Sequence, residues 1–363
     1  MKNKSNGEIT MAEFVEASPF VSVIMPVYNE ARFVEKAVRS FLDNDYTDDR
    51  MEIVVIDGMS NDGTRDVLQD IAGRESRLRV VDNPQKFTPI SMNLGIQASR
   101  GDVIVVVGAH SEFANNYLSR CVDVLQRTGA GCAGGYMETL PGGSGAVAQA
   151  ISAATSSPFG VGGGKFRTGG TSEQEVDTVA FGAFRREVYE SVGLYHPLLI
   201  RNQDMEFSTR MRKAGYKIII SPDIHFTYYN RGTYRGLRQQ AFNNGLWNPY
   251  TLYLVGGGLR LRHFIPMGFV LSILTGIGLG FLWWPFWALL GVEIACYLLA
   301  AVWFSCKAGN KQNANPILVL FAFIQLHLSY GIGSLWGVLS APFKFGLRPR
   351  KNSGIPLLAP RDG

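Results

Sequence analysis

The sequence predicts an α/β fold, with an open, mostly parallel sheet flanked by helices and a C-terminal group of membrane-type helices. Two observations carry this prediction. Short runs of β-branched residues alternate with helix-forming segments from residue 21 to about residue 137. Beyond residue 263 the chain becomes strongly apolar, in stretches near 264–281, 286–304 and 317–339. Each stretch is close to the roughly 20 residues that a helix needs to cross a bilayer.

Four apolar runs are the expected strands, at 21–27, 52–56, 78–82 and 102–107. They are rich in Val and Ile on both faces, as buried strands of a parallel sheet are. Between the first two, residues 30–42 place apolar side chains at i, i+3, i+4 and i+7, which predicts an amphipathic helix. Open sheets of this kind bind ligands at the carboxyl ends of their strands.

The expected organisation is linear. Residues 1–18 form a flexible N-terminus, 19–250 the α/β domain, 251–343 the membrane-associated helical region and 344–363 a basic tail. The N-terminus has no apolar core of the kind found in cleavable signal peptides. The four cysteines lack metal-ligand spacing, which favours a reducing compartment without a disulfide framework.

The net charge of +5 is concentrated at the C-terminal end. Beyond His263 there are seven Lys or Arg residues against Glu293 and Asp362, so the preceding chain is balanced. This balance argues against a nucleic-acid partner, and the basic margin suits an anionic membrane surface. Three spans would separate the basic tail from the N-terminal domain, against the positive-inside rule. The third stretch is therefore either a span or an interfacial or re-entrant segment.

Polar side chains follow three of the expected strands. They lie in PVYNE (26–30), in VVIDGMSNDGT (54–64) and in VVVGAHSEF (105–113). Taken singly, Asn29 and Asp62 are equally well explained as helix caps or turn formers. A histidine at the end of one buried strand is, by itself, explained as incidental.

In this order, and followed by NQDME (202–206), the motifs resemble the family 2 glycosyltransferases with a GT-A fold over residues 20–245. The segments SSPFGVGGGKFR (156–167) and VDTVAFGAFRREV (176–188) are similar to a membrane-associated subgroup of that family. This subgroup is typified by the succinoglycan-biosynthesis glucosyltransferases of bacterial exopolysaccharide assembly. The resemblance implies a sugar-nucleotide site at the carboxyl ends of the strands.

The resemblance assigns the donor nucleotide to five residues: Pro26, Tyr28, Glu30, Asp57 and Ala109. Among these, Asp57 corresponds to the acid that contacts the base. The family's D-x-D motif reads Gly108-Ala109-His110 here, which makes His110 the expected ligand of a divalent metal, Mn²⁺ or Mg²⁺. The first carboxylate is absent at Gly108, so either its ribose contact comes from elsewhere or the donor binds more weakly. Glu112 is a further candidate oxygen ligand, with a solvated loop charge as the alternative.

The resemblance implies that Asp204 is the catalytic base. A base for the acceptor hydroxyl must be ionised at neutral pH, and a place in the first turn of a helix favours that form. Glu206 is a poorer candidate because it is positioned to pair with Arg210. A structural helix-capping role for Asp204 is the alternative.

Further contacts to the diphosphate or the acceptor are expected from Arg185, Arg231, Gln240 and Trp247, with Arg186 an additional basic candidate. The processive synthases of this superfamily carry Q-x-x-R-W in this region. Neither Gln239 nor Gln240 begins that pattern, which favours the addition of a single sugar.

The expected activity is an inverting transfer of a hexose, with glucose from UDP-glucose the best candidate, onto a polyprenyl-diphosphate-linked saccharide. The expected place is the cytoplasmic face of a bacterial inner membrane, in exopolysaccharide or surface-glycan assembly. Three alternatives remain: a polyprenyl-phosphate glycosyltransferase, a catalytically inactive assembly subunit, and a transporter. The sequence offers little for the last, since the apolar stretches contain one acid, Glu293.

Overall fold

The computed structural model describes residues 18–162, 164–347 and 354–359. Most of the predicted flexible N-terminus (1–18) and much of the predicted basic tail (344–363) therefore lie outside the described residues.

The chain forms two compact units that interleave in the sequence. The first unit combines Met1–Tyr136, Thr171–Phe226 and Gly354–Gly363, and the second combines Met137–Gly170 and Thr227–Ser353. This division differs from the linear order expected from the sequence, because two long strands each begin in the first unit and end in the second. The functional boundaries of the α/β domain stay a prediction.

The parallel half of the sheet runs in the order β3-β2-β1-β4. It consists of β1 (Val21–Val27), β2 (Met51–Asp57), β3 (Leu78–Asp82) and β4 (Val103–Val106). Val27 pairs with Asp57, and Asp57 pairs with Asp82, so these strands end side by side. Every residue of β2 and β4 is buried, as their β-branched composition predicts.

Beyond β4 the sheet becomes antiparallel, through β8 and then β6. The remaining strands are β5 (Ser111–Phe113), β6 (Cys132–Leu140), β7 (Gln174–Glu175), β8 (Ala183–Arg185) and β9 (Ile218–Tyr229). The α/β fold class is confirmed, and the parallel arrangement applies to the β3–β4 half of a mixed sheet.

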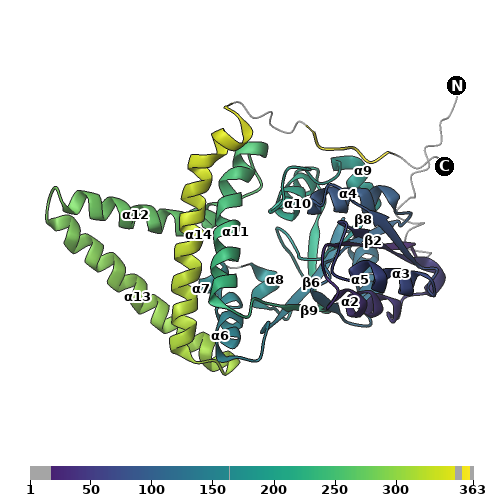
Figure 1. The fold of residues 1–363 in the computed structure, drawn as a ribbon, viewed down its shortest axis with the longest axis horizontal. Helices are drawn as coiled ribbons and strands as arrows, with labels where there is room; N and C mark the ends of the chain where they lie inside the picture. The colour runs from purple at the N-terminus through teal and green to yellow at the C-terminus, as the bar shows by residue number, and fades with distance from the viewer. Residues whose placement is uncertain (1–17, 163, 348–353, 360–363) are drawn as a thin grey trace. The chain divides into compact units, whose positions relative to one another are not determined.

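Helices cover both faces of the parallel half, with α4 and α9 on one side and α2 and α3 on the other (Figure 1). The helices of the first unit are α2 (Val34–Leu42), the short η1 (Asp48–Arg50), α3 (Thr64–Ala72), α4 (Thr88–Ala98), α5 (Tyr117–Thr128), α9 (Arg186–Val192) and α10 (Gln203–Lys213). The predicted amphipathic helix is α2, whose buried face contains Val34, Val38 and Phe41.

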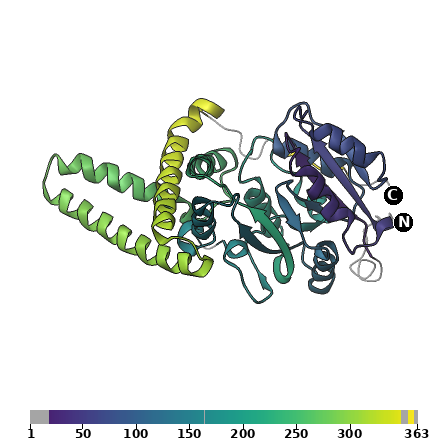
Figure 2. The ribbon, with the colours of Figure 1, turned by 60° about the horizontal axis from the view of Figure 1, so that its bottom comes forward.

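The described part of the second unit is mainly helical. It contains α6 (Ala146–Thr155), α7 (Pro158–Val161), α8 (Lys165–Thr168), α11 (Tyr234–Val255), η2 (Leu261–Phe264), α12 (Ile265–Gly280), α13 (Pro285–Gln312) and α14 (Pro316–Phe345). Three helices are long and apolar enough to cross a membrane: Leu261–Gly280, Pro285–Gln312 and Pro316–Phe345. The three apolar stretches expected from the sequence coincide with them, apart from Phe281. Figure 2 shows α12 and α13 as a hairpin.

Candidate active site

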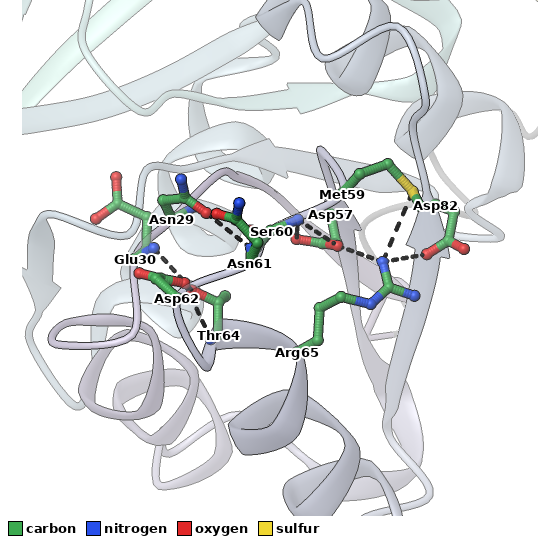
Figure 3. Close-up of polar contacts among 10 residues, drawn as sticks. All are labelled: Asn29, Glu30, Asp57, Met59, Ser60, Asn61, Asp62, Thr64, Arg65 and Asp82. Carbon is green, nitrogen blue, oxygen red and sulfur yellow. Dashed lines mark hydrogen bonds and ion pairs between the residues drawn. The ribbon is translucent and has the colours of Figure 1, made fainter.

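The loops that follow β1 and β2 are tied together by short polar side chains (Figure 3). The backbone N–H of Asn29 donates to Ser60 Oγ at 2.9 Å, and the N–H of Asn61 donates to Asn29 Oδ1 at 3.0 Å. Asn29 adopts a left-handed backbone conformation with φ of 57°, which asparagine tolerates better than most residues. The Asn29 side chain therefore fixes the loop.

Asp62 has a similar role between the same loops. Its carboxylate accepts hydrogen bonds from Thr64 Oγ1 at 2.5 Å, from the Thr64 N–H at 3.1 Å and from the Ala31 N–H at 3.1 Å. These bonds, the Thr64 hydroxyl first among them, lower the pKa of Asp62. The turn-forming interpretation of Asp62 accounts for its contacts.

Asp57 ends β2 and its side chain is fully buried. The carboxylate accepts the Ser60 N–H at 3.1 and 3.3 Å, and Arg65 Nη1 lies 2.5 Å from its Oδ2. The same Arg65 nitrogen lies 2.9 Å from Asp82 Oδ1 on the neighbouring strand (Figure 3). A buried carboxylate needs such compensation because its desolvation is costly. The predicted base-contacting acid is thus held rigidly at the sheet edge.

Tyr28 lies in the first of these loops, and its side chain is half exposed. Lys86 Nζ lies 5.2 Å from the centre of its ring, in cation–π geometry. Pro26 belongs to β1, adjacent to the loop. An exposed aromatic ring can stack on a planar base, and the nucleotide-binding role expected for Tyr28 and Pro26 stays a prediction.

Glu30 and His110 are brought into contact although 80 residues separate them in the chain. His110 Nε2 lies 2.8 Å from Glu30 Oε1, with the His110 side chain 44% exposed and that of Glu30 17% exposed. The contact forms because β1 and β4 are neighbouring parallel strands. An imidazole that donates one N–H to a carboxylate keeps its other nitrogen available, which is the usual arrangement of a metal-ligating histidine.

The residues next to His110 in the chain limit which other side chains can serve as metal ligands. Glu112 is engaged by Lys36, with Nζ 2.6 Å from its Oε1, so its carboxylate serves as a surface ion pair. Ala109 is buried. No group of three His, Cys, Asp or Glu side chains that could hold a metal occurs within the described residues. The role of His110 as a metal ligand, with Glu30 as its hydrogen-bond partner, stays a prediction.

Gly108 begins the segment that reads Gly-Ala-His. A Cβ atom built at Gly108 would meet the Phe181 ring at 3.6 Å, an ordinary contact. Phe181 itself adopts a positive φ of 51°, uncommon for an aromatic residue, and its carbonyl accepts the Tyr117 hydroxyl. Strained residues cluster at functional sites. The sequence did not single out Phe181, because no local pattern announces its backbone conformation.

Asp204 lies in the first turn of α10 and is exposed. Glu206, two residues later, is 3% exposed, and its carboxylate accepts two hydrogen bonds from Arg210 at 2.7 and 2.9 Å. The structure thus separates the two acids, since Glu206 is a buried structural partner and Asp204 faces solvent at a helix N-terminus. That position favours the ionised carboxylate.

The structure gives Arg185 and Arg186 a different role from the expected diphosphate contact. Arg185 is 4% exposed, and its guanidinium donates to the carbonyls of Leu125 and Ala130. Arg186 is also buried and donates to the carbonyls of Gly101 and Ser99. Both guanidinium groups hold backbone carbonyls inside the first unit, so we do not retain them as ligands of the donor.

The other three expected contacts belong to the second unit. Arg231 is exposed, Gln240 is half-buried, and Trp247 is buried, with Lys344 Nζ 5.3 Å from its ring. Because it is buried, the Trp247 side chain contributes to packing within the second unit. A role of Arg231, Gln240 or Trp247 toward the acceptor stays a prediction.

The mixed sheet, with polar groups at the carboxyl edge of its parallel half, is a GT-A-like fold. Residues 22–193 match the family description Glycosyl transferase family 2. The chain therefore carries a domain of this family, and the protein is a glycosyltransferase.

Two relatives align with most of the chain. It is 27% identical over 313 residues to the succinoglycan biosynthesis protein ExoA of Rhizobium meliloti (strain 1021), covering 86% of this chain and 92% of that protein. It is 26% identical over 324 residues to dolichyl N-acetyl-α-D-glucosaminyl phosphate 3-β-D-2,3-diacetamido-2,3-dideoxy-β-D-glucuronosyltransferase of Methanococcus voltae, covering 86% and 95%. Both alignments are too long to be confined to the family 2 domain.

A solved structure supports the fold. The mannosyltransferase PcManGT of Pyrobaculum calidifontis, determined in complex with GDP-Man and Mn²⁺, superposes with a TM-score of 0.59. The two chains are 18% identical, and the match covers 89% of this chain and 88% of that one.

Proposed function

We propose that this protein is an inverting hexosyltransferase that transfers a single sugar from a nucleotide donor to a lipid-linked saccharide. Glucose from UDP-glucose is the proposed donor, and a polyprenyl-diphosphate-linked saccharide is the proposed acceptor, in bacterial exopolysaccharide or surface-glycan assembly. The observation that carries the proposal is the contact between Glu30 and His110 at the carboxyl edge of the sheet, within a family 2 domain.

The donor would lie along this edge. Asp57 and Tyr28 would receive the base, because one is a fixed carboxylate and the other an exposed aromatic face. His110, oriented by Glu30, would hold a divalent metal, Mn²⁺ or Mg²⁺, together with the diphosphate. When bound, such an ion supplies Lewis-acid neutralisation of the leaving diphosphate.

Asp204 would act as the general base. The acceptor hydroxyl oxygen attacks the anomeric carbon and gives its proton to the Asp204 carboxylate, while the bond to the nucleoside diphosphate breaks. One such displacement inverts the anomeric centre. The exposed position of Asp204 in the first turn of α10 supports this role, because its carboxylate is ionised there and reachable by an acceptor.

The choice of acceptor is supported by the relatives. The Methanococcus voltae relative is named for a dolichyl N-acetylglucosaminyl phosphate, a lipid-linked sugar. The Rhizobium meliloti relative is named for succinoglycan biosynthesis. We further propose that the protein acts on the cytoplasmic face of a bacterial inner membrane, where a lipid-linked saccharide would be extended.

The base assignment is tested with membranes that contain the full chain. Membranes with wild-type protein, with Asp204→Asn or with Glu187→Gln are incubated with radiolabelled UDP-glucose, Mn²⁺ and lipid-linked saccharide. Glu187 is the matched control, since it is also exposed in the first turn of a helix. We expect lipid-extractable label to fall by about a hundredfold or more in Asp204→Asn alone. Equal label in wild type and Asp204→Asn would refute the base.

The identity of donor and acceptor is tested separately. A thermal-shift screen of nucleotide sugars in detergent should show the largest stabilisation with UDP-glucose in the presence of Mn²⁺. Chromatography of the labelled lipid then distinguishes an extended saccharide from a single sugar on a lipid phosphate. A single sugar on a lipid phosphate would mean that the acceptor is the lipid phosphate itself and not a lipid-linked saccharide.

A further inference from the structure

The three apolar helices of the second unit differ in how much of their surface the chain covers. In α13 and in the segment of η2 and α12, 11% of the apolar window is buried, whereas in α14 the share is 39%. The turn between α12 and α13 is especially open, with Phe281, Leu282, Trp283 and Trp284 between 62 and 81% exposed. Figure 2 shows this hairpin extending from α14. The hairpin therefore needs an apolar environment along its length.

The helix α14 is covered by α11, which lies beside it in parallel orientation (Figure 1). Hydrogen bonds join the two helices along their lengths: Tyr234 to Leu318, Arg238 to Gln325, Asn248 to Tyr330 and Tyr250 to Ser340. The backbones also approach closely, since a Cβ on Gly245 would lie 2.0 Å from the Tyr330 carbonyl oxygen. The two helices consequently occupy one environment.

The composition of α11 excludes the hydrocarbon core of a bilayer as that environment. Arg235, Arg238 and Gln239 are exposed, and Asn243 and Asn244 are half-buried. If α14 crossed the membrane, α11 would accompany it over its 22 residues, about 33 Å. That distance exceeds the thickness of the hydrocarbon core, where charged and amide side chains are strongly disfavoured.

The outer side of α14 is nevertheless apolar from one end to the other. Its large apolar side chains that are at least 50% exposed are Ile317, Phe321, Ile332, Trp336, Val338, Leu339 and Phe343. Their spacing places them on one face of the helix, opposite the face that packs on α11 and α6. A helix that is apolar on one side and joined to a polar partner on the other suits the membrane interface.

We propose that the α12–α13 hairpin crosses the bilayer and returns, while α14 lies in the plane of the membrane surface. The outer face of α14 contacts lipid, and α11 lies on the aqueous side. The 16 residues of α12 give about 24 Å, and the exposed apolar turn that begins at Phe281 continues toward the opposite interface. Two crossings keep Leu347, which follows α14, on the same side of the membrane as the residues that precede η2.

The distribution of charge agrees with this topology. Arg260 and Arg262 precede the hairpin, Lys307 and Lys311 end it, and between His263 and Lys307 the sequence has one charged residue, Glu293. Ser272 of α12 donates to the Glu293 carboxylate, so this acid has a partner across the hairpin. Basic residues therefore gather at the base of the hairpin, where they face anionic headgroups on the side of the first unit.

The first experiment locates three sites relative to the membrane. Single cysteines at Arg74, Leu282 and Leu347 are introduced into the full chain after replacement of Cys296 and Cys306 by Ala. The native Cys121 and Cys132 remain, because burial raises the pKa of both thiols and keeps them unreactive.

A membrane-impermeant maleimide is then applied to inside-out and right-side-out vesicles. We expect Arg74→Cys and Leu347→Cys to react in one preparation and Leu282→Cys in the other. Reaction of Leu347→Cys together with Leu282→Cys would mean that α14 crosses the membrane and would overturn the proposal. Reaction of all three cysteines in the same preparation would also overturn it, since the hairpin would then not cross.

The second experiment measures depth along α14 directly. Nitroxide labels on Phe321→Cys, Ile332→Cys and Phe343→Cys are studied in proteoliposomes by their relative accessibility to oxygen and to a polar nickel chelate. We expect similar, shallow depths at all three positions. A label at Ile332 that is much deeper than the other two would show a spanning helix. Labels at Leu282 and Leu289 on the hairpin serve as the reference, because they should differ in depth.

Discussion

Two acidic corners at the carboxyl edge of the sheet differ in how fully the chain satisfies them. In the arginine corner, formed by Asp57, Arg65 and Asp82, the Asp57 carboxylate is fully buried and paired with Arg65. In the histidine corner, formed by Glu30 and His110, the imidazole is 44% exposed. In the arginine corner the buried carboxylate has its partners within the chain, whereas in the histidine corner the imidazole is partly exposed to solvent.

The difference teaches how burial changes what each carboxylate requires from the chain. A carboxylate without solvent contact needs a partner supplied by the chain itself, because its desolvation is otherwise uncompensated. A neutral, partly exposed imidazole has no such requirement, so His110 can exchange water for a ligand. We therefore expect loss of Arg65 to act mainly on stability, and mutations of Glu30 and His110 to act mainly on transfer.

The largest effect is expected from His110→Ala. Transfer should fall by about a thousandfold, since the charge stabilisation that a bound divalent ion supplies is worth several kcal/mol. His225→Ala is the control, because His225 is also an exposed histidine of the first unit. The measurement is the rate of label transfer against Mn²⁺ concentration. Unchanged Mn²⁺ dependence in His110→Ala would return this histidine to an incidental role.

The arginine corner is tested by Arg65→Met. Removing the guanidinium leaves the buried Asp57 carboxylate with the Ser60 N–H but without its ion pair, which should lower the free energy of unfolding by about 3 kcal/mol. Arg74→Met provides the comparison, because Arg74 and Asp70 form an exposed pair worth at most about 0.5 kcal/mol. Unfolding in detergent measures both variants. A similar loss of unfolding free energy in Arg65→Met and Arg74→Met would mean that burial of Asp57 does not strengthen its ion pair.

A smaller effect is expected from Glu30→Gln. This change keeps the size of the side chain but removes the carboxylate that orients His110, and loss of such a partner costs about tenfold in metal affinity or activity. The apparent affinity for Mn²⁺ in the transfer assay should fall accordingly. Glu35→Gln, on an exposed side chain of α2, should leave it unchanged. An equal effect of both substitutions on the apparent Mn²⁺ affinity would mean that Glu30 does not support metal binding by His110.

The smallest effect concerns the pH dependence of stability, through His196. Burial lowers the pKa of His196; the charge of Glu206 raises this pKa, and the charge of Arg210 lowers it. His196 Nδ1 accepts a hydrogen bond from the Leu198 N–H, which requires that this nitrogen be unprotonated. Because the folded pKa is lowered, the unfolded chain takes up the proton first as pH falls below the ordinary value of 6.5.

Stability should therefore decrease slightly on acidification from pH 7 to pH 5. Thermal unfolding across this range should show a weaker decrease for His196→Gln than for wild type. Identical pH profiles would mean that other groups carry the dependence.

The sequence predicted a large part of the fold and of the donor site for local reasons. The strands β1 to β4 were recognisable because parallel strands buried on both faces need continuous β-branched runs. Glu30 and His110 were each assigned to the donor site through the resemblance of their strand-end motifs to family 2 glycosyltransferases. Their contact was not predicted, because it depends on β1 and β4 being neighbours in the sheet.

The expected diphosphate role of Arg185 shows the opposite case. An arginine after a strand reads as a possible anion ligand, and nothing nearby in the sequence indicates that the carbonyls of Leu125 and Ala130, 60 and 55 residues away, occupy its guanidinium. The positive φ of Phe181 was equally invisible, since it arises from tertiary packing.

The sequence by itself determined the α/β class, the motifs at the strand ends and the existence of three apolar helices, because these follow from periodicity and composition along short segments. Only the tertiary structure decided which acid is buried, which imidazole meets a carboxylate and which apolar helix is covered by a polar neighbour. Those properties depend on contacts between residues 17 to 90 positions apart, and the free energy of a buried charge or an exposed apolar face is set by its neighbours in space.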